Sequence, residues 1–121
     1  MVDDLRNHTK DEVISSLKIR ETNLFFDENV LLEPGLIENM AQTVALHTGY
    51  SYFLKGVEPP TGYIGAIKNV DIFRLPALHE MILTKARILQ EFMGVTLVEI
   101  EIFDQSNQIM ACCQMKTVIT D

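Results

Sequence analysis

The sequence has few cysteines, no long apolar segment and no excess of positive charge, and each of these shortages excludes a class of protein. Its two cysteines, Cys112 and Cys113, are adjacent, so the sequence offers neither a disulfide framework nor a C-x-x-C spacing. No stretch approaches the roughly 20 apolar residues of a bilayer span, and residues 1–10 are polar and acidic, unlike a signal peptide. We therefore expect a cytoplasmic protein without disulfides or membrane-spanning segments.

Charge and histidine content exclude two further kinds of site. Seventeen acidic residues against ten basic ones give a formal charge of −7, which is the wrong sign for holding a phosphate backbone. We therefore expect no nucleic acid and no membrane among the partners. The three histidines, His8, His47 and His79, are scattered and form no H-x-x-x-H pair, so the sequence predicts no metal site and no cofactor.

The composition that remains is that of one small globular domain. Of the 121 residues, 47% are hydrophobic and 22% are charged, which is the balance of an ordinary folded core. Domains usually have roughly 100–150 residues, so we expect residues 1–121 to form a single unit. The one cluster of glycine and proline, at residues 56–62, predicts a loop inside this domain.

One helix is predicted over residues 36–50, and its pattern indicates that it is mostly buried. Pro34 and Gly35 provide its start, and Glu33 and Glu38 lie near the positive end of its macrodipole. At about 100° per residue, its apolar side chains cover half of the circumference. These side chains are Leu36, Ile37, Met40, Ala41, Val44 and Ala45, and Leu46 widens the apolar surface further.

Alternation of apolar and polar residues predicts strands around that helix. In residues 95–103, Val98, Ile100 and Ile102 share one face while the glutamates between them share the other, as in a half-buried strand. Further strands are expected at residues 12–19, 63–73, 82–88 and 108–119. This order predicts an α+β hotdog fold, in which a curved antiparallel sheet of about five strands wraps a long central helix. The exposed edge of such a sheet predicts a dimer formed through that edge.

Two motifs place this arrangement near a known family. Residues 25–29 read FFDEN and residues 34–42 read PGLIENMAQ, and together they resemble the 3-hydroxyacyl-acyl-carrier-protein dehydratase family of hotdog proteins. That family carries Phe-Phe-x-Gly-His-Phe-Pro and then Glu-x-Met-Ala-Gln at the opening of its central helix. The similarity continues through YIGAIKNV at residues 63–70 and covers most of the chain. The run GLIENMAQT is also similar to a dehydratase-like branch associated with lipid or polyene pigment assembly on carrier protein.

The resemblance implies a reaction and a set of site residues. In the family, a histidine removes the α-proton of a 3-hydroxyacyl thioester, and the helix acid protonates the departing hydroxyl, which leaves a trans-2-enoyl thioester. Glu38 matches the helix acid, and Gln42, one turn later, is placed to orient its carboxylate. Gly35 would present a backbone N–H to the thioester carbonyl, while Gly65 and Ala66 would let the substrate approach the backbone of a strand.

One departure from the family pattern weakens the implied mechanism. The family histidine falls at Asn29, and an amide cannot take up a proton at neutral pH. Asn29 is therefore either a hydrogen-bonding group for the thioester or a plain loop residue. The other candidates have structural alternatives as well: Glu38 as a first-turn glutamate that stabilises the helix dipole, Gln42 as a polar rim residue, and the glycines as conformational requirements.

The histidines and cysteines have structural interpretations. His47 falls on the apolar stripe of the helix, which predicts a buried histidine whose hydrogen bonds are satisfied. His8 and His79 are expected at the surface. Cys112 and Cys113 alternate across a strand and are interpreted as small buried hydrophobic residues.

The sequence thus predicts an acyl-thioester-binding hotdog protein of dehydratase type, whose activity without the family histidine stays open. Its partner would be a thioester of acyl carrier protein or coenzyme A, bound in a homodimer or a higher homo-oligomer. Lys68, Lys85, Arg87 and Lys116 are either a basic rim for an acidic carrier protein or scattered surface charges. Two alternatives stay open: a thioesterase that uses Glu38, and an inactive subunit of a heteromeric dehydratase whose partner chain supplies the histidine.

Overall fold

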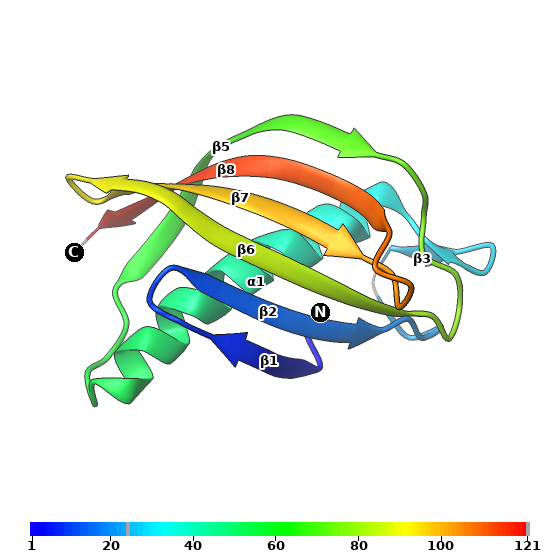
Figure 1. Ribbon diagram of the computed structural model, residues 1–121, viewed down its shortest axis with the longest axis horizontal. Helices are drawn as coiled ribbons and strands as arrows, with labels where there is room; N and C mark the ends of the chain where they lie inside the picture. The colour runs from blue at the N-terminus through cyan, green and yellow to red at the C-terminus, as the bar shows by residue number, and fades with distance from the viewer. Residues whose placement is uncertain (24, 121) are drawn as a thin grey trace.

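The computed structural model describes residues 1–23 and 25–120 and shows one long helix lying in the hollow of a curved antiparallel sheet (Figure 1). The elements are β1 (Asp4–His8), β2 (Glu12–Lys18), β3 (Phe26–Asp27), β4 (Val30–Leu31), α1 (Glu33–Leu54), β5 (Thr61–Ile72), β6 (Met81–Phe92), β7 (Val95–Phe103) and β8 (Ile109–Thr120). This is the α+β arrangement that the sequence predicts. No helix in the described part of the chain has both the length and the apolar character needed to cross a bilayer.

The main sheet has six strands in the order β1-β2-β6-β7-β8-β5, and β3 pairs with β4 in a separate hairpin. The strand β1 was not predicted, because its sequence DLRNH has no apolar alternation; it forms by antiparallel pairing with β2. The helix ends at Leu54 rather than at residue 50, where the sequence predicted its end. Its end is fixed by Gly56, which follows the C-cap and adopts a φ of 69°, a conformation that glycine provides at low cost.

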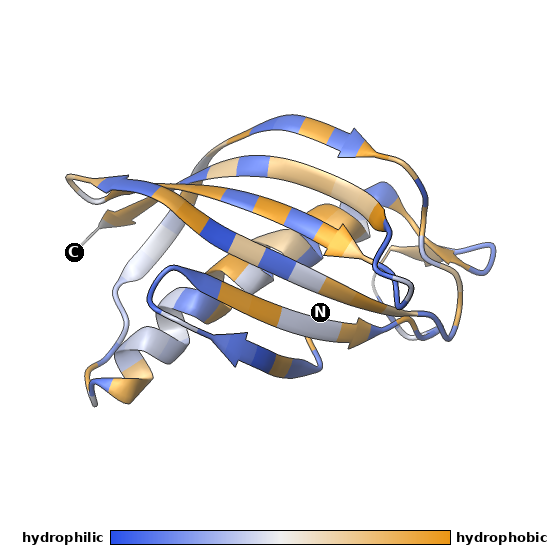
Figure 2. Ribbon diagram, in the orientation of Figure 1, coloured by the Kyte–Doolittle hydropathy of each residue, from blue (hydrophilic) through white to orange (hydrophobic). Residues whose placement is uncertain are grey.

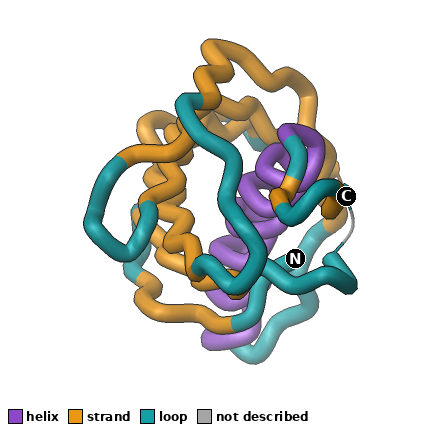
Figure 3. The backbone as a smooth tube through the Cα atoms, turned by 90° about the vertical axis from the view of Figure 1, so that its right-hand side faces the viewer, coloured by secondary structure: helices purple, strands orange, loops and turns teal. Residues whose placement is uncertain are grey.

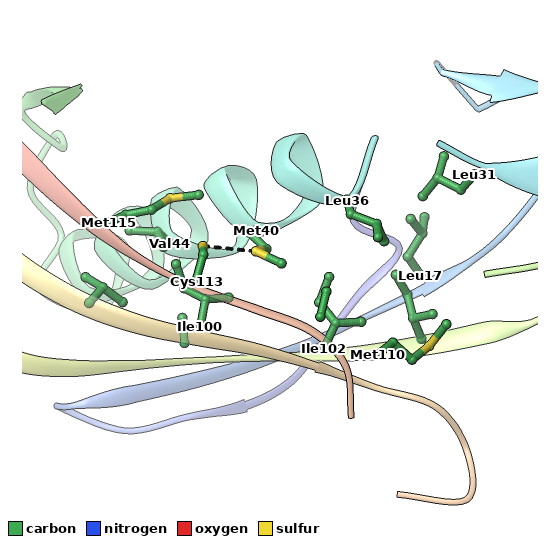
Figure 4. Packing of buried hydrophobic residues seen from close by; sticks show 14 of the residues in the cluster. Leu17, Leu31, Leu36, Met40, Val44, Ile100, Ile102, Met110, Cys113 and Met115 are labelled. Carbon is green, nitrogen blue, oxygen red and sulfur yellow. Dashed lines mark hydrogen bonds between the residues drawn. The ribbon is translucent and has the colours of Figure 1, made fainter. Parts of the chain in front are cut away.

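The core lies between α1 and the concave face of the sheet. Hydrophobic and hydrophilic residues alternate along β6 and β7 (Figure 2), and Ile100 and Ile102 are fully buried, as predicted. Leu36 and Met40 reach toward these strands from the helix, and the Cys113 thiol donates to the Met40 sulfur at 3.2 Å (Figure 4). Viewed from the side, the sheet curves around the helix (Figure 3).

The strand β5 is the outer strand of the sheet beyond β8, and it is exposed along almost its whole length. Its pairing with β8 shifts register between Ile64 and Ala66 and again between Lys68 and Asp71, so it carries two bulges. Apolar side chains stay open along it: Tyr63, Ile64, Ile67 and Val70 are each more than 40% exposed. An unpaired backbone edge with apolar side chains is a surface that a second chain would cover, and the dimer stays a prediction.

Candidate active site

Glu38 and Gln42 meet on the face of α1 that points away from its own sheet. The buried residues of the helix, among them Leu36, Met40 and His47, face the sheet, and Glu38 lies on the other side. The Gln42 side-chain amide donates from Nε2 to Glu38 Oε1 at 2.9 Å. Gln42 Oε1 in turn accepts a hydrogen bond from the amino group of Met1. The predicted pair is thus formed, with both side chains half-buried.

The carboxylate of Glu38 has no cationic partner among the salt bridges of the described residues. It sits near the start of α1, and the neutral Gln42 amide donates one hydrogen bond to it. Because Gln42 occupies Oε1, the second oxygen of Glu38 is the one available to a ligand.

An apolar groove of about 260 Å³ begins one helical turn after Glu38. On the helix side it is lined by small residues, including Ala41, Ala45 and Gly49, and on the other side by Tyr63 and Ile64 of β5. The space exists because these helix residues have little or no side chain, and a Cβ on Gly49 would meet nothing within 4 Å. The groove can therefore hold an apolar chain, and Glu38 lies about one helical turn before the first residue of α1 that lines it.

A second cavity of about 660 Å³ continues from the groove toward the C-terminal half of α1. The two share Val44, Thr48, Thr117 and Ile119 in their linings. Its lining combines apolar residues, among them Ala86, Ile88 and Val98, with polar ones that include His8 and His47.

The structure confirms His47 as a buried histidine and corrects the expectation for His8. His47 is 8% exposed, and its Nε2 donates to the Thr9 carbonyl at 2.9 Å. His8 is half-buried rather than a surface residue: its ring stacks on His47 with centroids 4.8 Å apart, and its Nε2 lies 3.0 Å from Ser51 Oγ. His79 is exposed, as expected. Within the described residues, no hydrogen bond joins any histidine to Glu38.

Asn29, at the position of the family histidine, lies in the turn between β3 and β4. The turn residues Glu28 and Asn29 have φ values of 48° and 66°, as in the tight turns that close two-residue hairpins. The Asn29 side chain is exposed, and its carbonyl accepts from the Leu78 N–H at 2.9 Å. No side-chain hydrogen bond in the described part of the chain links Asn29 to Glu38. These features fit the interpretation as a loop residue, and a substrate contact stays a prediction.

Gly35 is required by packing at the start of α1. A Cβ at this position would lie 2.6 Å from Cδ1 of Leu31, and both residues are buried. Its N–H donates to the Leu32 carbonyl at 2.9 Å. The expectation of a free donor at Gly35 is therefore not met, because the first turn of the helix already uses this N–H.

Gly65 and Ala66 lie on the exposed edge strand β5. Gly65 sits in the first bulge of β5, and a Cβ there would approach Cγ2 of Val118 to 3.3 Å. Ala66 pairs with Lys116, whose neighbour Met115 is fully buried, so Ala66 shares the outer face of the sheet with Lys116. Neither residue belongs to the hydrogen-bonded pair of Glu38 and Gln42.

A cluster of charges anchors the loop between β5 and β6. Arg74 donates to Glu80 through two hydrogen bonds of 2.8 and 2.6 Å and to Asp104 at 3.1 Å. The Arg74 guanidinium lowers the pKa of the Glu80 carboxyl, and Glu80 raises the pKa of Arg74. The backbone N–H of Gln108, and then Arg74, lower the pKa of Asp104. This loop also carries Pro76, whose carbonyl accepts from the N–H of the residue that ends β4, so the cluster steadies the segment leading into α1.

The other sequence candidates lie on the outer face of the sheet or in the core. Lys85 and Arg87 form ion pairs with glutamates of neighbouring strands, at 3.6 Å to Glu12 and 2.8 Å to Glu99. Two of the four residues proposed for a basic rim are therefore neutralised locally. Cys113 is buried as predicted, whereas Cys112 is only half-buried. No group of three or more potential metal-ligating side chains occurs among the described residues.

Sequence reasoning missed the groove and the stacked histidines. The signal for the groove was present: Ala41, Ala45 and Gly49 recur every four residues and mark one helix face without bulky side chains. The pairing of His8 with His47 had no such signal, because it depends on the position of β1.

Comparison with solved structures shows the same fold in several proteins of low sequence identity. A chain of the dehydratase heterocomplex ApeI:P from Xenorhabdus doucetiae has a TM-score of 0.88 and 13% identity, over 99% of this chain and 82% of that chain. The protein smu.793 from Streptococcus mutans UA159, bound to acetyl CoA, has a TM-score of 0.79 and 13% identity, over 97% and 87% of the two chains. A hypothetical thioesterase from Streptococcus pneumoniae TIGR4 with coenzyme A has a TM-score of 0.81 and 10% identity, over 97% and 87%.

No curated protein matches the sequence. A family model does, under the description "ApeP-like: ApeP dehydratase", and it spans residues 1–120. The match includes the segment that places Glu38 and Gln42 on the opening turns of α1. The chain therefore belongs to the ApeP-like dehydratase family.

Proposed function

We propose that this chain binds acyl thioesters as a hotdog subunit of dehydratase type, with Glu38 exchanging protons with the substrate. The observation that carries the proposal is the setting of Glu38. Its half-buried carboxylate is held by Gln42 at 2.9 Å, has one oxygen available, and stands one turn before an apolar groove of about 260 Å³. An acyl chain in the groove would place the carbons next to its thioester near the carboxylate.

The proposed reaction is the dehydration of a 3-hydroxyacyl thioester. The substrate loses a proton from C2 and its hydroxyl from C3, and the products are a trans-2-enoyl thioester and water. Protonated Glu38 would give its proton to the departing hydroxyl, while a base accepts the C2 proton. Gln42 would fix the orientation of the carboxyl group during this exchange, because its amide holds one of the two oxygens.

The missing base favours a second candidate, in which this chain is one half of a heteromeric dehydratase. Asn29 stands at the position of the family histidine, and none of the histidines hydrogen-bonds Glu38 within the described residues. A partner hotdog subunit would then supply the histidine across the exposed edge of β5. The similarity to a chain of a dehydratase heterocomplex supports this candidate.

The proposed carrier of the acyl group is acyl carrier protein or coenzyme A. Two structures of the same fold hold acetyl CoA or coenzyme A, which supports a thioester of this kind. We propose that the edge of β5, with Gly65 and Ala66, approaches the substrate of a second subunit in a homodimer or a heteromer. Asn29 and Gly35 are weaker substrate contacts, because Asn29 closes a turn and the Gly35 N–H is already bonded.

The test is to incubate the pure protein with 3-hydroxyacyl and acyl thioesters of carrier protein, alone and with candidate hotdog partners, and to follow the products by mass. Glu38→Gln is expected to lower the rate at least about 100-fold, the usual size of a general acid–base contribution. Glu33→Gln is the matched control, because this exposed carboxylate opens the same helix and lies outside the pair with Gln42.

The products separate the candidates. An enoyl thioester formed by the protein alone supports the dehydratase, and one formed only in a mixture supports the heteromeric subunit. Free acid identifies a thioesterase, in which Glu38 would activate water. Equal rates for Glu38→Gln and the parent would show that the proton exchange has been assigned to the wrong residue.

A further inference from the structure

We propose that a buried polar network between α1 and the sheet sets the rotation of α1 about its axis, and that Asn39 is the positioning residue that keeps Glu38 on the outward face. The effect of this rotation on catalysis rests on the proposed function. The control of the rotation by the network does not rest on it and can be tested separately.

Apolar packing alone gives α1 no clear preference for one rotation, because apolar side chains lie on both of its faces. Leu36 and Met40 face the sheet and are fully buried. Ile37 and Leu46 lie elsewhere on the helix and are half-buried, and Phe53 is 72% exposed. A helix whose apolar side chains spread beyond one stripe has a weaker preference for the side that turns inward.

Polar groups in the helix–sheet interface supply the preference for one rotation that the apolar pattern does not provide. Asn39 is fully buried; its Nδ2 donates to the Met1 carbonyl at 2.8 Å, and its Oδ1 accepts from Thr84 Oγ1 at 2.5 Å. One turn later, Thr43 Oγ1 donates to the Asn39 carbonyl at 2.8 Å and lies 2.8 Å from Ser15 Oγ. Thr84 and Ser15 belong to β6 and β2, so the network joins the helix to two strands.

The network is satisfied at one rotation of the helix. No buried side-chain nitrogen or oxygen in the described part of the chain lacks a hydrogen-bond partner. Turning α1 by one residue, about 100°, would leave these groups buried and unpaired, and such groups are costly in a core. The same turn would carry Glu38, the neighbour of Asn39, from its outward position toward the sheet. The hydrogen bonds of Asn39 and Thr43 therefore determine where the carboxylate points.

The experiment measures the rotation directly with two reporter cysteines. Val44→Cys places a thiol on the inward face, where Val44 is 8% exposed, and Ala45→Cys places one on the exposed side. The two positions are adjacent, so local unfolding affects both equally and the ratio of their labelling rates by N-ethylmaleimide reports rotation. Peptide mapping by mass spectrometry separates these thiols from Cys112 and Cys113.

The ratio is compared between the parent and Asn39→Leu/Thr84→Val, which removes both sides of the central hydrogen bond. The replacement removes donor and acceptor of this bond together and leaves only the half-buried Met1 carbonyl without its donor, so the variant is expected to stay folded. The preference for the Ala45→Cys thiol is expected to fall about fivefold, since the net contribution of a buried hydrogen bond is roughly a factor of five in an equilibrium. Thr84→Val alone is expected to lower this labelling preference as well. Thr84→Ser, which keeps the hydroxyl, is expected to keep the preference of the parent.

Ser51→Ala is the matched control. It removes the hydrogen bonds of Ser51 with the His47 carbonyl and with His8, on the same helix but outside the network. The ratio is expected to stay at the parent value. If Ser51→Ala lowers the ratio as much as Asn39→Leu/Thr84→Val, the effect is a general loosening of α1, and the inference is wrong.

An unchanged ratio in folded Asn39→Leu/Thr84→Val would overturn the inference. If that variant fails to fold, the labelling ratios of Thr84→Val and Thr84→Ser are compared instead, and equal ratios for these two variants would overturn the inference. In a parent that dehydrates its substrate, Thr84→Val is expected to lower kcat with little change in KM, and Thr84→Ser to recover it. A parent without any thioester activity would refute the proposed function, while the labelling ratio would still decide this inference.

Discussion

Two glycines of the same helix are predicted to respond in opposite ways to substitution by alanine. Gly35→Ala adds a methyl group whose carbon would lie 2.6 Å from Cδ1 and 2.8 Å from Cγ of Leu31, a side chain that is fully buried and cannot turn into solvent. Gly49→Ala adds the same group where nothing lies within 4 Å. We expect the first substitution to destabilise the protein and the second to stabilise it.

The magnitudes follow from two opposing terms. Overpacking of a core costs about 1–3 kcal/mol. Replacing glycine by alanine inside a helix contributes about 1 kcal/mol in the other direction. Gly35→Ala is therefore expected to lower the free energy of unfolding by up to about 2 kcal/mol. Gly49→Ala is expected to raise it by about 0.5–1 kcal/mol.

Urea unfolding at one fixed protein concentration measures both variants, with the midpoint reporting stability as long as the slope stays constant. A background that carries Leu31→Ala supplies the sharper test. With that side chain truncated, Gly35→Ala is expected to become stabilising, and the double-mutant cycle gives the clash as a coupling energy. Should Gly35→Ala stabilise the protein in the parent background, the close approach to Leu31 would not control this position.

Two further predictions concern titration. The pKa of Glu80 is lowered from 4.5 in the folded chain, so its pairing with Arg74 stabilises the protein above the unfolded-state pKa and is lost as pH falls through the folded value. Arg74→Met is therefore expected to cost at most about 1 kcal/mol at neutral pH, because the pair is partly exposed, and urea midpoints of variant and parent should converge in acid. Burial raises the pKa of Cys113 to about 12, so iodoacetamide near neutral pH is expected to leave it unmodified in the folded protein and to label Cys112 first. Rapid labelling of Cys113 would contradict its place in the core.

The fold could be predicted where the sequence pattern coincides with burial. The alternation in β7 is regular, and Ile100 and Ile102 occupy the inner face as expected. The helix start at Glu33 is marked by Pro34 in the first turn, a local signal that does not depend on tertiary contacts. By contrast, β1 is polar and forms only because β2 offers it an edge, which no local pattern reveals.

The candidate site could be predicted only in part. The spacing of Glu38 and Gln42 on one helix face fixes their contact from sequence. The fate of the Gly35 N–H could not be read in the same way, because it depends on whether the first turn closes onto the Leu32 carbonyl. The stacking of His8 on His47 could not be predicted from sequence either, because the path of the chain before α1 brings the two residues together.

The two bulges of β5 limit what its open edge can join. Its ladder with β8 runs in register only over residues 61–64, 66–68 and 71–72, and Asn69, in the second irregularity, has a φ of 56°. A flat strand would template indefinite stacking of further chains, as in fibrils. A bulged and twisted strand such as β5 can pair only with a strand whose own irregularities match it. The bulges are therefore expected to protect this acidic protein against edge-to-edge aggregation.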